Sequence, residues 1–143
     1  MHGRMGSLPV LFVYVRSTQM RICLDFDGVL HDYLHPVPGK KMGPPIDGAH
    51  DACWMLTRQG HELTVCTVRI DITHGGDKGK HVIDWLDYFD FPTMPVLRWK
   101  PNADVYVDDR GLRFEQDHDD RSGLTAWDCT MVKLRMLGAT GGR

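Results

Sequence analysis

The feature that most constrains the fold is an alternation, from Met20 onward, between short apolar runs and amphipathic segments. A short apolar run that ends in acidic or polar residues is typical of a buried strand, and apolar residues at helical spacing indicate a helix. Strands that alternate with helices form right-handed crossovers and build a parallel sheet covered on both faces. The sequence therefore predicts a doubly wound α/β domain. The expected strands are 21–26, 61–67, 94–99 and 103–107, and the expected helices are 47–59, 80–89 and 125–137.

Local signals mark the ends of several of these elements. Asp47 is expected to cap the first helix with its side chain, and Gly60 is placed to end it. The segment 29–45, between the first strand and this helix, is rich in Gly and Pro and is expected to form a loop. A short apolar segment, 112–114, is a candidate for a further strand.

The length of 143 residues fits one domain. We expect that domain over 20–137, with an N-terminal extension over 1–19 and a flexible tail over 138–143. The apolar stretch in the extension is short, is interrupted by Arg16 and is followed by no small-residue cleavage site, so it does not predict a signal peptide. It is also far below the ~20 apolar residues that a membrane helix needs. We therefore expect a cytoplasmic protein with no membrane association.

Composition excludes some classes of protein. With 42% hydrophobic and 25% charged residues, the chain is not composed like a disordered one. Its 17 Lys and Arg nearly balance 19 Asp and Glu, so it lacks the basic excess of a non-specific DNA-binding protein. The four cysteines are widely spaced and include no C-x-x-C pair, which favours free thiols over a disulfide framework or a zinc site.

Polar residues with reactive side chains stand where the expected strands end. The first strand runs into Asp25-Phe26-Asp27-Gly28-Val29, the second ends at Thr67, Lys100 follows the third, and the fourth ends in Asp108-Asp109. Ligand sites of open α/β sheets lie at the carboxyl ends of the strands, so these residues are expected to meet at one edge. Four carboxyl groups gathered there would repel one another unless a cation held them. The pattern therefore favours a functional site over four unrelated structural acids.

The same residues, in the same order, resemble the four motifs of the haloacid dehalogenase (HAD) superfamily. Those motifs are Asp25-x-Asp27-Gly28-Val29, Thr67, Lys100 and Asp108-Asp109, and the resemblance covers Met20 to about Arg113. The run from Lys100 to Arg110 is similar to that of small bacterial and phage phosphatases of the superfamily. The resemblance implies a three-layer, Rossmann-like parallel sheet with helices on both faces.

The resemblance also implies a role for each acid of the first motif. Asp25 would attack phosphorus and form an aspartyl-phosphate, which divides one difficult step into two. Asp27 would protonate the leaving oxygen and then deprotonate the attacking water, so Asp27 must carry a proton while Asp25 is ionised. In this superfamily the second Asp marks phosphatases and is absent from dehalogenases, so a phosphatase is expected.

An all-oxygen site of this kind suits Mg2+. The implied ligands are the Asp25 carboxylate, the Asp27 backbone carbonyl and a carboxylate of Asp108 or Asp109, and the sequence leaves open which acid of that pair binds the metal directly. The metal would allow an anionic nucleophile to approach an anionic phosphate.

The remaining motif residues are expected to contact the substrate. Thr67 would donate its hydroxyl to the phosphate, with help from nearby backbone N–H groups, and Gly28 and Val68 belong to the same expected set. Arg69 either touches the substrate or is a solvated loop residue.

Lys100 would offset charge on the nucleophile and on a phosphoryl oxygen. Lys78 and Lys80 are rival candidates for this role, but Lys100 directly precedes the acidic strand. Arg110 is a candidate structural partner of Asp109.

Histidines are not expected to be ligands. His31 and His35 stand in the loop after the nucleophile, where Pro36 and Pro38 argue against a helix, so both are expected to be solvated. The acidic segment 117–120 is expected to be an exposed turn.

The spacing of the motifs leaves no room for a packed cap domain, because only about 20 residues separate Gly28 from the first expected helix. The site should be open, shielded at most by the 29–45 loop or by a second subunit of a homo-oligomer. An open site suits substrates with a bulky end, such as nucleic-acid termini, phosphoproteins or sugar-nucleotide-like molecules. The expected substrate is a phosphorylated small molecule or a nucleic-acid terminus.

We therefore expect a Mg2+-dependent phosphomonoester hydrolase that acts on a nucleotide or a nucleic-acid end. Its first motif and its acidic strand also resemble those of 5′(3′)-deoxyribonucleotidases and of the phosphatase half of polynucleotide kinase-phosphatase. A kinase half is not expected, because the chain has no G-x-x-x-x-G-K-[ST] loop. A HAD-like binding or regulatory module without turnover is the alternative from a different class.

Overall fold

The computed structural model describes residues 19–114 and 123–137, and the chain divides into two compact units, 1–109 and 110–143. Within the described residues, the first unit holds the sheet and two helices, and the second holds one helix. Apart from Gln19, the expected extension lies outside the described residues, as do the tail and the expected acidic turn over 117–120. The domain limits expected from the sequence therefore stay predictions.

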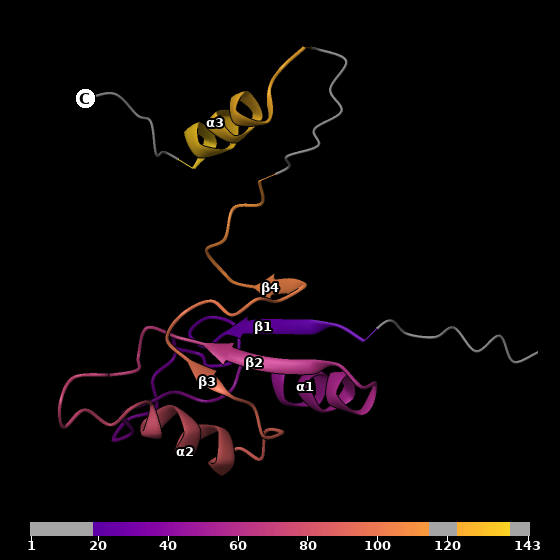
Figure 1. Cartoon of the computed structure of the whole chain (residues 1–143). Coiled ribbons are helices and arrows are strands. Elements are labelled where there is room, and N and C mark those ends of the chain that lie inside the picture. The colour runs from indigo at the N-terminus through magenta and orange to yellow at the C-terminus, as the bar shows by residue number, and fades with distance from the viewer. Residues whose placement is uncertain (1–18, 115–122, 138–143) are drawn as a thin grey trace, which may run out of the picture. The chain divides into compact units, whose positions relative to one another are not determined.

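The first unit is built on a four-stranded parallel sheet with the strand order β3-β2-β1-β4 (Figure 1). The central strand, β1 (Arg21–Asp25), lies between β2 (Glu62–Cys66) and β4 (Val105–Val107), and β3 (Val96–Leu97) lies at the edge beyond β2. The register places Asp25 beside Cys66 and Leu24 beside Val107, so all these strands end at the same edge. The predicted α/β class with a parallel sheet is confirmed.

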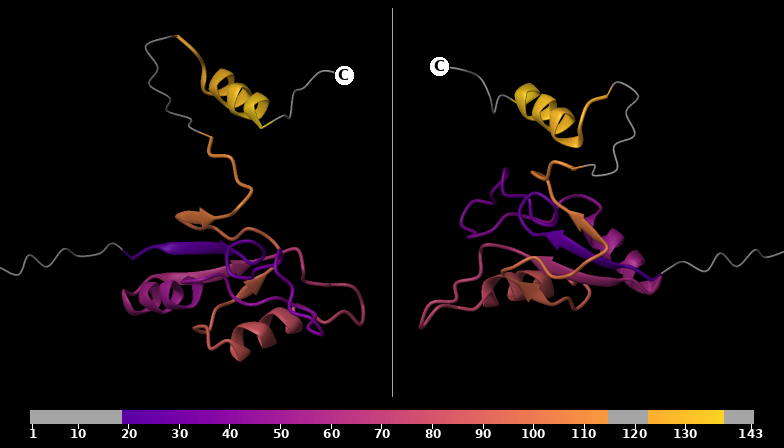
Figure 2. Two further views of the ribbon diagram at one scale, coloured as in Figure 1. Left: turned by 180° about the vertical axis from the view of Figure 1, so that it is seen from behind. Right: turned by 45° about the horizontal axis from the view of Figure 1, so that its top comes forward.

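Two helices connect the strands of the first unit. α1 (Ala49–Arg58) joins β1 to β2, and α2 (Lys80–Tyr88) joins β2 to β3. Both lie on the same face of the sheet (Figures 1 and 2), as two right-handed crossovers in the same direction require. A helix on the opposite face stays a prediction.

The hydrophobic core lies between these helices and the sheet. Side chains at alternate positions of the first strand and its end, Ile22, Leu24 and Phe26, belong to one buried cluster with Val65 of β2 and Val82 of α2. Phe26, Val65 and Val82 are fully buried, and burying a side chain of this size contributes about 1.5–3 kcal/mol. The core therefore anchors β1 directly before its functional end.

The exposed edge strand β4 is held by hydrogen bonds between Arg21 and Asp104 rather than by burial. Its three residues are all exposed, but Asp104, which precedes it, accepts hydrogen bonds from the Arg21 side chain at 3.0 and 3.3 Å. The Arg21 N–H also donates to this carboxylate at 2.8 Å, and the Asp104 N–H donates to the Arg21 carbonyl at 2.8 Å. This fork fixes where β4 begins, and so where Asp108 and Asp109 fall at its end.

Several element bounds differ from the sequence-based expectations. The first helix is capped by Gly48 in a left-handed conformation, with no side-chain cap, so the prediction of Asp47 as its cap is wrong. The third strand covers only Val96–Leu97 of the expected 94–99, and residues 112–114 form no strand. Proline explains the short third strand, because Pro95 has no N–H to donate and serves the sheet only by accepting from Val65.

The second unit contains α3 (Ala126–Met136), close to the predicted helix over 125–137. Thr125 and Asp128 form a capping box, in which Asp128 N–H donates to Thr125 Oγ1 at 3.1 Å and the Asp128 carboxylate accepts from Thr125 N–H at 2.8 Å. Trp127 packs against Phe114, with their ring centroids 5.1 Å apart. Among the described residues, no helix is long and apolar enough to cross a membrane.

Candidate functional site

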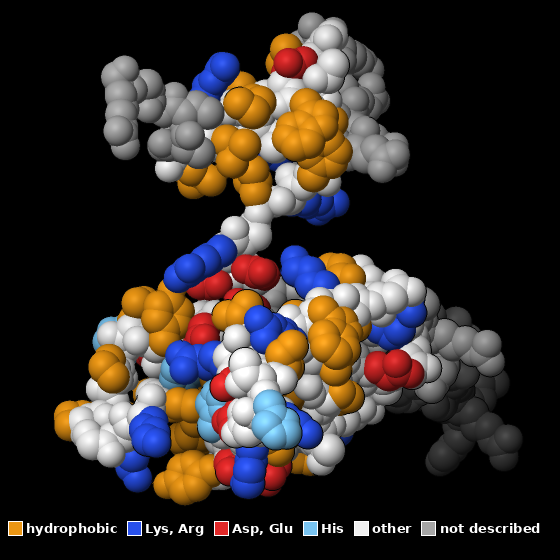
Figure 3. All heavy atoms as spheres, turned by 60° about the vertical axis from the view of Figure 1, so that its left-hand side comes forward, with side chains coloured by type: hydrophobic (Ala, Val, Ile, Leu, Met, Phe, Trp, Pro, Cys, Tyr) orange, Lys and Arg blue, Asp and Glu red, His pale blue; other side chains and the backbone are white. Residues whose placement is uncertain are grey.

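The expected functional residues of the first unit do gather at the carboxyl edge of the sheet. Figure 3 looks toward this edge and shows acidic, basic and histidine side chains close together on it. The chain reaches the edge at the ends of β1, β2 and β4, which are neighbours in the sheet although they are distant in sequence. The parallel register therefore brings the polar residues that follow these strands to one edge of the sheet, as the sequence pattern predicted.

Three carboxyl groups form an acidic cluster at this edge. Asp25, Asp108 and Asp109 each offer one oxygen atom, and these atoms all lie within 4.8 Å of one another. Asp25 is partly buried, whereas Asp108 and Asp109 are exposed. Both acids of the second pair thus belong to the cluster, and which of them would bind a metal directly stays open.

Gly28 makes room for this cluster. A Cβ atom on Gly28 would lie 2.2 Å from Asp109 Oδ2, and the residue has a φ of +81°, which side-chain-bearing residues rarely adopt. Its N–H donates to the His31 carbonyl at 2.9 Å, so this amide is already hydrogen-bonded within the loop. The structure therefore gives Gly28 a packing role beside Asp109 rather than a free N–H for phosphate.

The environment of Asp25 disfavours its charge. Burial raises the pKa of this carboxyl group, and the negative charges of Asp108, Asp109 and Asp27 raise it further, although a hydrogen bond from Phe26 N–H at 2.8 Å acts in the opposite direction. The net pKa lies above the ordinary value. A cation among these acids would reverse the effect of their mutual repulsion.

The carboxylate of Asp27 is held at both of its oxygen atoms. Arg69 Nε donates to Oδ2 at 2.6 Å, and His31 Nδ1 lies 2.7 Å from Oδ1. Gly43 N–H donates to His31 Nε2 at 2.8 Å, so Nε2 must be the unprotonated nitrogen and Nδ1 carries the proton that is donated to Asp27. Asp27 is therefore oriented by two donors from different parts of the chain.

These two donors also set the charge of Asp27. Burial raises its pKa, but the hydrogen bonds and positive charge of Arg69, with the hydrogen bond from His31, outweigh burial, and the net pKa lies below the ordinary value. The roles implied by the motif resemblance require a protonated Asp27 beside an ionised Asp25. The two environments do differ, but in the opposite direction in this structure.

His31 is not the solvated loop residue that the sequence predicted. Its side chain is only 2% exposed, it stacks on Phe26 with ring centroids 5.1 Å apart, and its edge meets Trp85 at 5.6 Å. The prediction was wrong because the loop folds back on the strand, where His31 bridges to Asp27 and Pro45. The only local signal was its position directly after Leu30, which is also buried. His35, in contrast, has a 79% exposed side chain, as predicted.

Thr67 and the two residues after it follow β2 into the site. Thr67 is buried, its N–H donates to the Leu97 carbonyl at 2.8 Å, and its Oγ1 accepts from Arg69 N–H at 3.2 Å. Its own amide is thus used by the sheet, while its hydroxyl hydrogen can still be donated. Val68 is 86% exposed, and its N–H has no partner among the described residues. Arg69 is no solvated loop residue, because it is bound to Asp27.

The structure separates the candidate lysines. Lys80 Nζ contacts both oxygens of Asp84 at 2.6 Å, one turn away on α2, so its charge is engaged on that helix. Lys100 lies over the ring of Tyr106, 5.2 Å from its centroid, and forms no ion pair with a described residue. Its charge acts on Cys66, the strand neighbour of Asp25, and lowers the pKa of that thiol against the dominant effect of burial. Of Lys80 and Lys100, Lys100 is therefore the one whose charge reaches the end of β2, and its role in the site stays a prediction.

The acidic cluster fits a hard divalent cation such as Mg2+. Carboxylate oxygens are its preferred protein ligands, and three of them here converge on one place with unfavourable mutual charge. Cys23, Cys53 and Cys66 are free thiols, and burial raises the pKa of Cys23 and Cys53 to about 11, so neither of these two supplies a thiolate ligand near neutral pH. Arg110 lies in the second unit, so its pairing with Asp109 stays a prediction.

Comparison with known proteins supports the fold. No family model matches the chain, and no curated protein matches it. Among solved structures, a conserved protein from Bacteroides thetaiotaomicron is similar, with a TM-score of 0.51 and 19% sequence identity, over 87% of this chain and all of that one. At this identity the likeness shows a shared α/β fold alone.

Proposed function

We propose that the chain is a Mg2+-dependent phosphomonoester hydrolase of the HAD type, in which Asp25 is the nucleophile. The observation that carries the proposal is the acidic cluster, in which Asp25, Asp108 and Asp109 present oxygens within 4.8 Å of one another at the carboxyl edge. The motif resemblance supplies the reaction type. Mg2+ held by these carboxylates and by the Asp27 carbonyl would neutralise charge on the phosphate and on Asp25.

Two chemical steps follow from these roles. An Asp25 carboxylate oxygen attacks phosphorus, the bond from phosphorus to the leaving oxygen breaks, and Asp27 gives that oxygen a proton. Water then attacks the phosphorus of the aspartyl-phosphate and loses a proton to Asp27, and the bond from phosphorus to Asp25 breaks. Inorganic phosphate leaves, Asp25 is again a carboxylate, and Asp27 again carries a proton in place of the one that it gave to the leaving oxygen.

Arg69 connects this scheme to the observed charge of Asp27. While Arg69 binds Asp27 Oδ2 at 2.6 Å, that carboxylate is held ionised. A substrate phosphate competes for the same guanidinium, and transfer of Arg69 to the phosphate would raise the pKa of Asp27, which would then take up a proton from solvent before the first step. The free Val68 N–H and the Thr67 hydroxyl hydrogen are further donors for the phosphate oxygens.

The substrate class proposed from the sequence is a nucleotide or a nucleic-acid end, with a 5′(3′)-deoxyribonucleotidase-like reaction as one form of it. A homo-oligomer that shields the site and a cytoplasmic location belong to the same proposal. A panel of nucleotides, 3′-phosphorylated oligonucleotides and sugar phosphates distinguishes these substrates.

Hydrolysis of p-nitrophenyl phosphate with and without Mg2+ tests the proposal. We expect metal-dependent turnover by the wild type, none by Asp25→Asn, and normal turnover by Asp87→Asn, which changes an exposed acid on α2 outside the cluster. If the folded wild type shows no metal-dependent turnover on this substrate or on the panel, the chain is a binding or regulatory module instead.

A further inference from the structure

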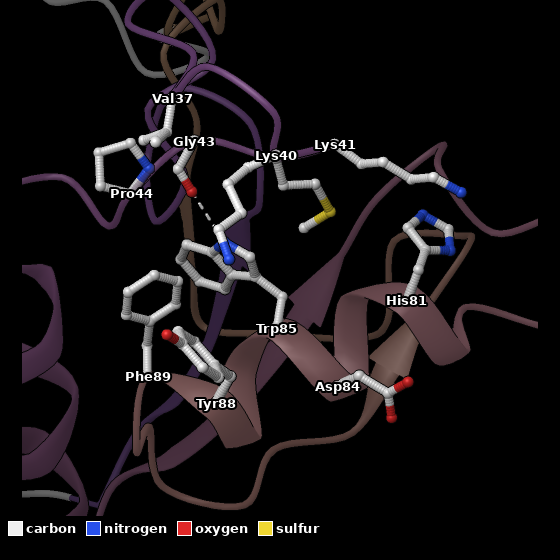
Figure 4. Close-up of a pocket in the computed structure, with 11 residues that line it drawn as sticks. Val37, Lys40, Lys41, Gly43, Pro44, His81, Asp84, Trp85, Tyr88 and Phe89 are labelled. Carbon is white, nitrogen blue, oxygen red and sulfur yellow. Dashed lines mark hydrogen bonds between the residues drawn. The ribbon is translucent and has the colours of Figure 1, made fainter.

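A cavity of about 620 Å3 opens between α2 and the loop 37–44 (Figure 4). Cavities of this size accommodate small organic ligands. None of the acidic-cluster residues lines it. It is therefore a concave feature of the first unit apart from the acidic cluster, and the proposed hydrolysis assigns it no role.

Aromatic rings of α2 form one wall of the cavity. Trp85, Tyr88 and Phe89 all line it, with ring centroids 4.9 Å apart between Trp85 and Phe89 and between Tyr88 and Phe89. Trp85 Nε1 donates to the Gly43 carbonyl at 2.9 Å, shown as the dashed line in Figure 4. Because its single polar atom is already bonded, the indole offers only carbon surface to a ligand. This wall suits a flat apolar ring.

The loop side of the cavity contributes two lysines. Lys40 and Lys41 line it, and neither forms an ion pair with any residue that the structure describes. The acid on the helix side, Asp84, is already paired with Lys80 at 2.6 Å, and His81 is hydrogen-bonded to Asp77. The cavity therefore combines an apolar aromatic wall with two positive charges that have no counter-ion within the described part of the chain.

We propose that this cavity binds a small molecule that carries a flat aromatic ring and one anionic group. The ring would pack on the aromatic wall, and the anion would lie near Lys40 and Lys41. A bare inorganic anion would leave the aromatic surface hydrated, and a neutral ring would leave both ammonium groups without a partner. Carboxylate, sulfonate and phosphate share this chemistry, and the site does not depend on turnover at Asp25.

A pair of fluorescent probes tests the proposal directly. 8-Anilinonaphthalene-1-sulfonate carries the ring and the anion, and N-phenyl-1-naphthylamine has the same rings without the anion. We expect the folded full chain to bind the sulfonate probe at one saturable site, with an affinity at least about tenfold higher than for the neutral probe. Benzoate and phenyl phosphate, added as competitors, distinguish the preferred anion.

Variants separate the two features of the cavity. Lys40→Gln with Lys41→Gln should weaken the sulfonate probe about tenfold and leave the neutral probe unchanged. Lys78→Gln, an exposed lysine outside the cavity, is the matched control and should change neither. Tyr88→Ala should weaken both probes and Tyr88→Phe should not. Equal binding of the two probes, or a lysine variant with unchanged affinity for the sulfonate, would overturn the proposal.

Indole resonances locate the bound probe. The sulfonate probe should shift the Nε1–H signal of Trp85 and not that of Trp54, which donates to the Asp90 carbonyl elsewhere in the unit. Saturable binding that leaves the Trp85 signal unmoved would place the probe at another site and would contradict the assignment. Circular dichroism of each variant verifies that the protein stays folded.

Discussion

The loop that follows β1 and the end of β4 meet at one edge of the sheet, but their acids are held in different ways. Asp27, after β1, accepts hydrogen bonds at both carboxylate oxygens, and the His31 that orients it is buried. Asp108 and Asp109, after β4, are exposed and crowd against Asp25. Around Asp27, the protein itself supplies a hydrogen-bond donor to each carboxylate oxygen. Around Asp25, Asp108 and Asp109, negative charges are brought close together.

This difference indicates what each side requires. Where every oxygen has a donor, the fold itself fixes the geometry. Where three carboxyl oxygens lie within 4.8 Å of one another, their mutual repulsion contributes to the raised pKa of Asp25, and added positive charge would oppose it. Substitutions on either side of the site should therefore have different effects.

Replacement of the nucleophile should have the largest effect. Asp25→Asn keeps the size of the side chain but removes the attacking carboxylate, so kcat should fall by roughly 10^3-fold or more. Because the change also removes one of three crowded charges, thermal stability without metal should rise. A kinetic assay together with thermal unfolding in EDTA measures both, and substantial remaining turnover by Asp25→Asn would exclude it as nucleophile.

The two lysines provide the next comparison. Lys100→Ala should lower kcat by about 10^2–10^3-fold if Lys100 offsets charge at the reacting centre. Lys80→Ala should leave kcat almost unchanged, because it removes only an exposed i, i+4 pair with Asp84 that is worth about 0.3–0.5 kcal/mol. Steady-state kinetics of both variants decides the matter, and the opposite ranking would make Lys80 the functional residue.

His31 tests the side that the fold completes. His31→Leu removes the donor to Asp27, so hydrolysis of an alkyl phosphate, whose leaving group needs a proton, should fall about 10–100-fold. Hydrolysis of p-nitrophenyl phosphate should fall less, because its leaving group departs without protonation, and His31→Asn should restore part of the loss by supplying an N–H. An equal loss on both substrates would indicate that His31 has only a structural role.

Gly28 tests the side that concentrates charge. Gly28→Ala would place a methyl group 2.2 Å from Asp109 Oδ2, displace that acid and weaken Mg2+ binding by about tenfold. Gly60→Ala is the matched control, because Gly60 also has a positive φ, +87°, but nothing lies within 4 Å of its Cβ position. Both variants should lose about 1 kcal/mol of stability from backbone strain. Calorimetric titration with Mg2+ tests the difference, and equal affinities would contradict the assigned packing role of Gly28.

The smallest effect concerns how β4 is anchored. The Arg21 hydrogen bonds lower the pKa of Asp104, so this carboxylate stabilises the fold above the ordinary Asp pKa of about 4, and the contribution is lost as the pH falls through the lowered value. Asp104→Asn should therefore lower Tm slightly at pH 7 and not in acid below both values. A Tm difference that persists in strong acid would show that the charge of Asp104 does not matter.

The position of the acidic cluster could be predicted from the sequence. Each acid directly follows an apolar run, and a parallel sheet brings the ends of such runs to one edge whatever the loops between them do. The local sequence pattern was therefore sufficient to select Asp25, Asp108 and Asp109 as candidate site residues. Gly28 was also visible locally, although its approach to Asp109 was not.

The state of Asp27 could not be predicted in this way. Its charge depends on Arg69, which is 42 positions away, and on His31, whose burial depends on Trp85 from α2 and on Gly43. The Arg21–Asp104 fork spans 83 positions. Such contacts arise from packing between elements, and no periodicity or spacing within one segment reports them.

The most direct test of the account is to look for phosphate on Asp25. The protein is mixed with Mg2+ and p-nitrophenyl phosphate, quenched in acid during turnover, digested and analysed by mass spectrometry. We predict one phosphoryl group on the peptide that contains Asp25, lost on treatment with hydroxylamine and absent from Asp25→Asn. Turnover without any phosphorylated peptide, or with the phosphoryl group on another residue, would contradict the central claim that Asp25 is the nucleophile of this site.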